Sequence, residues 1–491
     1  MNRKLIGYTL ISAMSIQNAL ACTTILVGPG ASKDGSFIVA RNEDYQAANA
    51  KHVLISPHKE NQTGEYKPTE ENNFTYPLPK ESLRYGHVSD WETNGYSMGE
   101  VGFNEAGVGV SSTETIYNGE QVLKIDPYVE KTGITEDAIL DVLLSRIRSA
   151  KEGVELLGKI VETKGAGEGF GVAFVDKDEI WYLETATGHH WMAARLPKDR
   201  YFVSANQGRL KEFDPNDSEN YLASKGLISF ATENGLYDPE KDAVFDFHKI
   251  FSQDVENDIT YNYPRVWTVQ HMFNKGLDTK IGDGKEFPVF LKPDNRIGLE
   301  EIKTALRNHY QGTEYDPYTN ENPAEPYRPI SVFRGEESHM LHVRPELPME
   351  IGHVKYVALG MSALSVYLPF YQGISSIPAG FDVGTDKASD DSVYWKFRKL
   401  QTLVMTDFNK YAPKVKESFA SFEASTADLQ KKMEDQYMAT YKNDPDQAKQ
   451  IIQDFQNKMV EDALALTASL TNEIFTQMTN DTDNKYHFEG A

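Results

Sequence analysis

The sequence contains a single cysteine, Cys22, which directly follows the small-residue tripeptide Ala19-Leu20-Ala21. A lone thiol cannot form an internal disulfide, and it cannot build a zinc site that needs several cysteines. The thiol is therefore incidental, a lipid attachment point or a nucleophile. Which of these applies depends on whether the chain is cut immediately before Cys22.

If the chain is cut after Ala21, Cys22 becomes the first residue and carries both a thiol and a free α-amine. An α-amine has an unperturbed pKa near 7.7–8.0, and a free thiol has one near 8.5. The amine can therefore accept the thiol proton near neutral pH, directly or through a water molecule, as in N-terminal threonine enzymes. One residue then supplies both the nucleophile and its base, and no histidine is required.

The first 21 residues have the three parts of a secretory signal. Residues 2–4 form a basic n-region, "LIGYTLISAMSI" is an apolar h-region, and Ala19-x-Ala21 is a cleavage site. The apolar run is shorter than the ~20 residues that span a bilayer. We therefore expect cleavage, export to the periplasm or the medium, and no stable membrane anchor. The alternative is an N-terminal core helix that stays attached.

The residues after Cys22 predict a β-hairpin that brings polar side chains to the thiol. "CTTILVG" is β-branched and strand-like, "PGASKDG" has turn chemistry, and "SFIVARNED" is a second strand. Pairing of the strands would bring Arg41 and Asp44 close to Cys22. The arginine would favour a thiolate, and the carboxylate would hold the α-amine or orient the arginine. The alternative is a surface ion pair of little energetic value.

Strand-like segments dominate the first three quarters of the chain, with helices between and after them. Residues 135–163 have apolar side chains at helical spacing, and residues 104–107 form a turn signal. From about residue 392 the pattern becomes helical, with one apolar face along residues 452–474. This order of elements predicts an α+β fold.

The chain is strongly acidic, with a formal net charge of -23. Residues 1–21 hold two basic residues and no acidic one, so a chain that begins at Cys22 would carry -25. A surface of this sign argues against nucleic acid as a partner, because phosphates need positive charge. It equally disfavours anionic lipid, and it is typical of a soluble protein.

Several stretches together resemble the dipeptidase A family of cysteine peptidases, which are N-terminal-nucleophile hydrolases. They are "CTTILVGPGASKDGSFIVARNEDY", "NEAGVGVSSTET", "IWYLETATGHHWMAAR", "YFVSANQ", "RVWTVQ", "YRPISVFRGEESHML" and "VALGMSALSVYLPFY". The resemblance implies a four-layer αββα sandwich with a helical C-terminal region. We accordingly expect a signal peptide at 1–21, a catalytic domain at 22–390 and a helical extension at 391–491.

The resemblance also implies amide hydrolysis by the N-terminal cysteine, with no metal or other cofactor. It matches Cys22 to the nucleophile and the amine of Cys22 to the base. It matches Arg41 to the arginine beside the thiol, and Asp44 to the aspartate that positions the nucleophile or its amine.

Three further roles are implied by shorter motifs and more distant relatives. Asn206, in "SANQ", is matched to the side chain of an oxyanion hole. Asn104, in the Asn-Glu-x-Gly turn, is matched to its second donor through the backbone N–H. Arg265, in "PRVW", is matched to an arginine that supports the site electrostatically.

The expected partners are a small peptide substrate, a dipeptide by resemblance, and the signal peptidase that matures the chain; the chain could also form a homo-oligomer. One alternative is a related amidase that acts on acyl-amino acids or bile-salt-like amides. The other is a lipoprotein binding module whose thiol is acylated and cannot act as a nucleophile. Lipoprotein sites favour leucine three residues before the cysteine, where this chain has Ala19.

Overall fold

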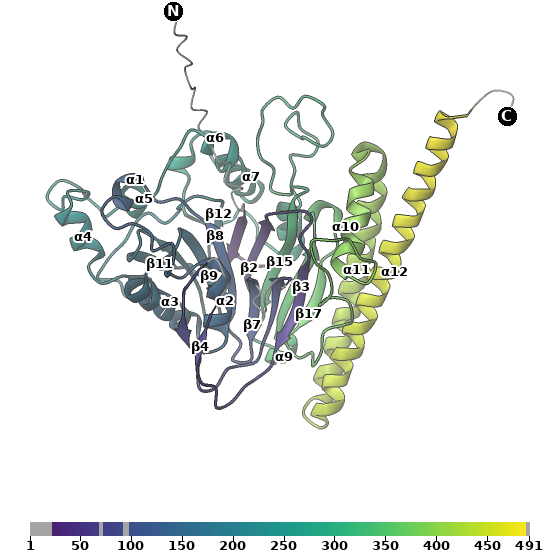
Figure 1. Cartoon of the computed structure of the whole chain (residues 1–491), viewed down its shortest axis with the longest axis horizontal. Helices are drawn as coiled ribbons and strands as arrows, with labels where there is room; N and C mark the ends of the chain where they lie inside the picture. Colours follow the sequence, from purple (N-terminus) through teal and green to yellow (C-terminus); the bar gives the residue numbers. More distant parts are fainter. Residues whose placement is uncertain (1–21, 68–71, 92–97, 488–491) are drawn as a thin grey trace, which may run out of the picture.

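A computed structural model describes residues 22–67, 72–91 and 98–487. Two antiparallel sheets lie face to face, and helices cover the outer face of each sheet (Figure 1). This αββα arrangement with helices at the C-terminal end confirms the predicted fold class. The predicted signal segment, residues 1–21, lies outside the described residues.

The first sheet has the N-terminal hairpin near its centre. β1 and the first half of β2 are rich in β-branched and apolar residues, as expected of central strands, and both strands are buried along their whole length. Thr24 lies opposite Arg41 in their register. The strand order is β14 (Phe290–Leu291), β12 (Tyr201–Ser204), β1 (Thr23–Val27), β2 (Phe37–Asp44), β15 (Gly335–Val343), β16 (His353–Leu359) and β17 (Leu368–Tyr371).

The second sheet is a series of antiparallel neighbours that packs on the first. Its order is β13 (Tyr221–Ala223), β11 (Trp191–Arg195), β10 (Ile180–Thr185), β9 (Phe170–Val175), β8 (Gly109–Thr115), β7 (Gly99–Asn104), β6 (Tyr85–Asp90) and β3 (Lys51–Ser56). A separate two-stranded ribbon pairs β4 (Glu65–Tyr66) with β5 (Tyr76–Pro77).

The helix predicted over residues 135–163 is two helices, α2 (Glu136–Leu144) and α3 (Ala150–Lys164), which pack on the second sheet. The break occurs because Ser149 has an extended backbone and its side chain caps α3 by accepting from the Glu152 N–H. The other short helices are α1 (Glu120–Leu123), α4 (Leu227–Glu233), α5 (Phe247–Phe251), α6 (Asp258–Tyr261), α7 (Tyr263–Phe273), α8 (Leu299–Leu306) and α9 (Met349–Gly352).

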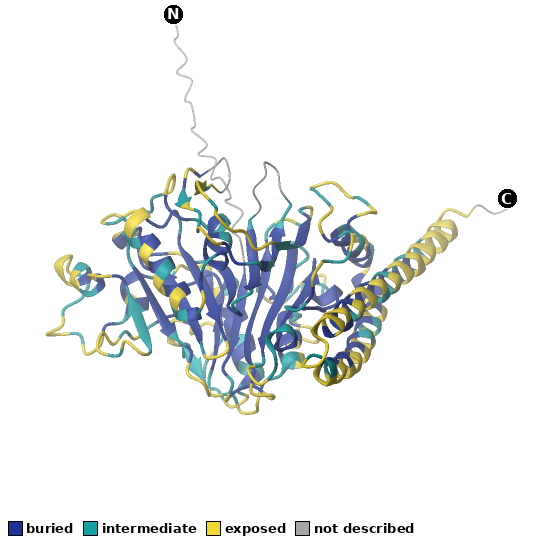
Figure 2. Ribbon diagram, turned by 90° about the horizontal axis from the view of Figure 1, so that it is seen from below, coloured by how far each residue is buried: buried dark blue, intermediate teal, exposed yellow. Residues whose placement is uncertain are grey.

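The C-terminal helices are α10 (Val393–Val404), α11 (Phe408–Thr440) and α12 (Pro445–Lys485), and they lie beside the first sheet (Figure 1). Each follows a capping side chain, from Ser392, Asp407 and Asp444 respectively. Ile452 and Ile474 are buried on α12, as the predicted apolar face requires. The end of α12 is exposed (Figure 2). None of the described helices carries an apolar run long enough to cross a membrane.

The space between the sheets is mostly apolar, but charged side chains also lie in it. Lys355 on β16 is 4% exposed and lines a small cavity with Arg84, Phe103 and Phe370. Burial lowers the pKa of Lys355 to about 7, with Arg84 acting in the same direction and Glu337 opposing it. A buried ammonium is costly because it has lost its hydration.

Replacing this lysine, Lys355→Met, is expected to stabilise the protein, most of all below pH 7. An unfolded chain would bind the lysine proton up to about pH 10.5, so the stability of the wild type rises between pH 7 and 10.5. Below pH 7 the wild type bears the full cost of the buried charge, at most about 5 kcal/mol. Urea unfolding at pH 6 and pH 10 measures the difference between the two proteins.

The exposed Lys59 provides the control for this prediction. At pH 6, Lys59→Met should change the free energy of unfolding by much less than Lys355→Met, because its side chain is already exposed. A Lys355→Met protein that is less stable than the wild type at pH 6 would show that the ammonium is well compensated.

Candidate active site

Cys22 lies at the start of β1 and is 2% exposed. Its main-chain nitrogen donates to Asn206 Oδ1 at 3.1 Å. In the full chain this nitrogen belongs to the peptide bond with Ala21, and in a chain that begins at Cys22 it would be the α-amine. The nitrogen of Cys22 therefore has a polar side chain of the protein beside it.

Arg41 lies beside the thiol, as the predicted hairpin requires. Its Nη1 is 3.6 Å from Cys22 Sγ, and its Nη2 is 2.5 Å from Glu100 Oε2 on the second sheet. Burial opposes the charge of Arg41, but the thiolate of Cys22 and the carboxylate of Glu100 outweigh it and raise the arginine pKa. Arg41 is thus a fixed cation beside the sulfur, and such a cation favours a thiolate.

Arg265, on α7, ties Cys22 to Asn206. Its Nη1 donates to the carbonyl oxygen of Cys22 at 2.5 Å and to Thr23 Oγ1 at 3.0 Å. Its Nη2 donates to Asn206 Oδ1 at 2.8 Å and to Asn262 Oδ1 at 2.5 Å. The buried guanidinium of Arg265 therefore binds both Cys22 and Asn206, so three of the predicted site residues lie together.

The Asn206 amide is fixed on both sides. Its Oδ1 accepts from Cys22 and Arg265, and its Nδ2 donates to the carbonyl oxygen of Thr115, at the end of β8, at 3.2 Å. Its backbone N–H donates to Asn262 Oδ1 at 3.1 Å. The orientation of this amide therefore follows from its neighbours, with the oxygen toward the cysteine nitrogen.

Asp44 is buried and forms an ion pair with Arg328. Burial raises its pKa, while Arg328 acts in the opposite direction. Arg41 and Asp44 lie on opposite faces of β2, because side chains alternate along a strand. The alternative of a surface ion pair between Arg41 and Asp44 is wrong, since both residues are buried and each has another ionic partner.

The structure does not support the predicted role of Asn104. The turn at residues 104–107 is present, but the Asn104 N–H donates to the Val108 carbonyl oxygen at 3.0 Å and closes the β7–β8 hairpin. Its side chain donates to the carbonyl oxygens of Leu144 and Ile147. Asn104 thus fastens α2 to the hairpin, and an N–H already used in a hairpin is not available as an oxyanion donor.

The sequence reasoning missed Asn262, Glu100 and Arg328. Asn262 had a local signal, since an asparagine one residue before Tyr263-Pro264 is typical of a helix start. Glu100 and Arg328 had none, because they meet their partners across 59 and 284 positions of the chain.

Comparison with known proteins matches most of the chain to a family. Residues 21–420 match the model of Peptidase family C69. A probable dipeptidase of Salmonella dublin is 59% identical over 374 residues, which cover 76% of this chain and 86% of that protein. A dipeptidase of Bifidobacterium longum is 35% identical over 415 residues, covering 78% and 77% of the two chains. The solved penicillin V acylase from Agrobacterium tumefaciens has 12% identity and a TM-score of 0.32, over 72% of this chain and 86% of that one.

Proposed function

Since the chain belongs to peptidase family C69, we propose that it is an exported dipeptidase whose nucleophile is the N-terminal Cys22 of the processed chain. The observation that carries the proposal is the geometry at Cys22. Arg41 lies 3.6 Å from its sulfur, and Asn206 accepts from its nitrogen at 3.1 Å. The relatives named as dipeptidases support dipeptides as the substrate class.

The proposed reaction uses both ends of Cys22. The α-amine takes the thiol proton, and the thiolate beside Arg41 attacks the carbonyl carbon of the peptide bond. The Asn206 amide nitrogen bears two hydrogens, and we assign it the donor role toward the oxyanion. The α-ammonium then protonates the leaving amine, and the C–N bond breaks to give a thioester. Water, deprotonated by the same amine, releases the acid and restores the thiol.

The surroundings of the thiol are suited to a substrate with a free carboxylate. Arg265 and Arg328 each lie 5.2 Å from the centre of the Tyr261 ring, and Arg334 donates to the Tyr261 hydroxyl at 2.7 Å. Arg41 and Arg265 contact Cys22, and Arg328 and Arg334 lie with Arg265 at the Tyr261 side chain, in a chain whose net charge is -23. In a dipeptide, the terminal carboxylate is only about 4 Å from the scissile carbon. A local group of cations is what such a carboxylate needs.

We expect the protein to hydrolyse unblocked dipeptides and to prefer the free acid over the C-terminal amide of the same dipeptide. One charge-assisted hydrogen bond is worth about 1.5–3 kcal/mol, so kcat/KM should differ by about 10- to 100-fold. The measurement is release of the amino-terminal residue from a dipeptide, its amide and its N-acetyl form. Faster cleavage of acyl-amino acids or bile-salt-like amides would instead favour the related amidase.

A further inference from the structure

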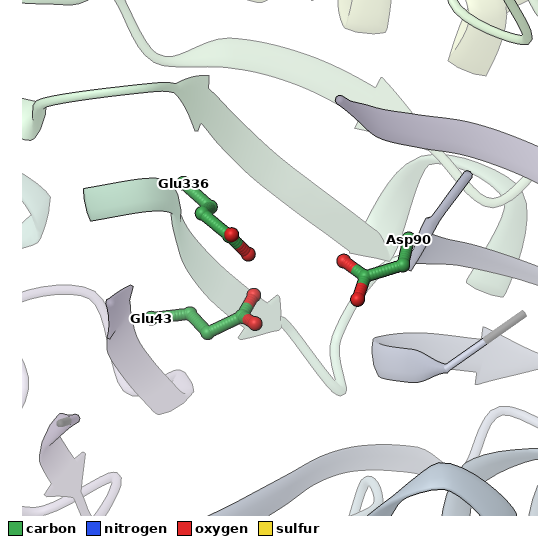
Figure 3. Close-up of side chains that lie close together, drawn as sticks. All are labelled: Glu43, Asp90 and Glu336. Atoms are coloured by element: carbon green, nitrogen blue, oxygen red, sulfur yellow. The ribbon is translucent and has the colours of Figure 1, made fainter. Parts of the chain in front are cut away.

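A cluster of charged side chains lies between the two sheets next to the thiol. It comprises Arg41 and Glu43 on β2, Glu336 on β15, Lys51 on β3, Asp90 on β6 and Glu100 on β7. Figure 3 shows three of the carboxylates, Glu43, Asp90 and Glu336, with their oxygens directed toward a common centre. We call these six residues the intersheet cluster.

Lys51 is the cation at the centre of these carboxylates. The three groups of Figure 3 present oxygens within 4.8 Å of one another, close enough to share one positive ion. The ammonium nitrogen of Lys51 lies 2.7 Å from Glu43 Oε1 and 3.0 Å from Glu336 Oε2, and it also contacts Asp90. Lys51 therefore supplies the charge that a metal ion would otherwise provide.

Glu100 connects this cation to the nucleophile. One of its oxygens, Oε1, lies 3.5 Å from Lys51 Nζ, and the other, Oε2, lies 2.5 Å from Arg41 Nη2. Arg41 then reaches Cys22 Sγ with its Nη1 at 3.6 Å. A flexible arginine is thus held by one nitrogen from the opposite sheet, while its other nitrogen faces the sulfur.

The ionisation of the cluster keeps Glu100 negative. Four carboxylates and two cations in a buried space leave an excess of negative charge, which is costly without compensation. Burial and the neighbouring Glu100 raise the pKa of Glu43, and burial raises the pKa of Glu336 to about 7. Burial also opposes ionisation of Glu100, but Lys51 and Arg41 outweigh it and lower its pKa. The excess negative charge is therefore relieved by protonation at Glu43 or Glu336 and not at Glu100.

We propose that Glu100 and Lys51 are positioning residues for the nucleophile, in which Lys51 anchors the Glu100 carboxylate between the sheets and Glu100 holds the Arg41 guanidinium against Cys22 Sγ. The inference rests on the proposed function, since it takes Cys22 as the reacting group. It assigns neither residue a contact with the substrate.

The test is Glu100→Gln in the processed protein, read by the pH dependence of Cys22 alkylation with iodoacetamide. Cys22 is the only cysteine, so the label reports on this thiol alone. If Glu100 positions Arg41, the cation leaves the sulfur and the midpoint of the alkylation profile rises by about one pH unit. The kcat should fall on the order of 10²-fold with KM nearly unchanged.

A purely electrostatic role for Glu100 predicts the opposite sign. Removing a negative charge near the thiolate would stabilise the thiolate, so the midpoint would fall. A lower or unchanged midpoint therefore overturns the proposal. Because alkylation needs no substrate, this outcome is distinct from a failure of the dipeptidase assignment, which would appear as absent dipeptide hydrolysis by the wild type.

Two further variants separate position from folding. Glu100→Asp keeps the charge but shortens the side chain. A positioning role for Glu100 still predicts a raised alkylation midpoint for this variant, whereas a role of its charge alone predicts no change in the midpoint. Glu423→Gln is the matched control, because Glu423, on α11, is a similarly buried carboxylate that pairs with Arg307 at 2.5 Å and with Lys303 at 3.3 Å. It should lower the melting temperature without moving the alkylation midpoint.

Discussion

Cys22→Ala is expected to abolish hydrolysis while leaving the fold intact. The substitution removes the only thiol and keeps the main-chain nitrogen that donates to Asn206. Loss of a catalytic nucleophile commonly costs about 10⁴-fold or more in kcat. The fold should persist because Cys22 is a small residue and the strand that follows it is paired on both sides. Initial rates on a dipeptide, with circular dichroism and thermal unfolding, measure both parts of the prediction.

The outcome that contradicts the mechanism is a folded Cys22→Ala protein whose kcat is within about tenfold of the wild type. Thr23→Ser provides a neighbouring control. It retains a hydroxyl at the position that accepts from Arg265 Nη1, so it should retain most of the activity.

The second large effect is expected from blocking the cut before Cys22. A bulky residue at the cleavage site, Ala21→Arg, should leave the leader attached, because signal peptidases require small residues there. The Cys22 nitrogen then stays in a peptide bond, where it cannot accept a proton. Loss of a general base typically costs about 10²–10⁴-fold in rate. Intact mass and dipeptide hydrolysis of the purified precursor measure the effect.

The matched control for processing is Ala19→Gly, which keeps a small residue at the cleavage site. It should yield a chain that begins at Cys22 and has wild-type activity. A wild-type chain that begins elsewhere, or a Cys22 that carries a lipid, would defeat the proposed activation; the lipid would favour the binding-module alternative. Full activity of the uncleaved precursor would exclude the amine as the base.

The sequence was most informative where the site is local. Cys22 and Arg41 are only 19 positions apart, and the strand–turn–strand pattern between them is sufficient to predict their contact. Asn206 and Arg265 meet Cys22 across 184 and 243 positions. No periodicity predicts such contacts, so those two residues were accessible only through the resemblance to a family.

The prediction for Asn104 was wrong because a turn motif specifies backbone geometry and not a role. Its N–H is used within the hairpin that the motif builds. The intersheet cluster was missed for a different reason. Charged residues at a strand end, such as Glu43 in "ARNED", usually face solvent, whereas here both faces of the strand are covered and the charges meet between the sheets.

The place of β1 in its sheet has a consequence for the proposed cleavage before Cys22. The first residues of a mature protein are ordinarily the part that frays. Here they would lead directly into a strand hydrogen-bonded to β12 on one edge and to β2 on the other. Pairing of β1 within the sheet therefore already orders the residues next to the new terminus, and the entropic cost of fixing that terminus is small. Cleavage would convert the Cys22 nitrogen from an amide to an amine, and the strand that follows would not need to rearrange.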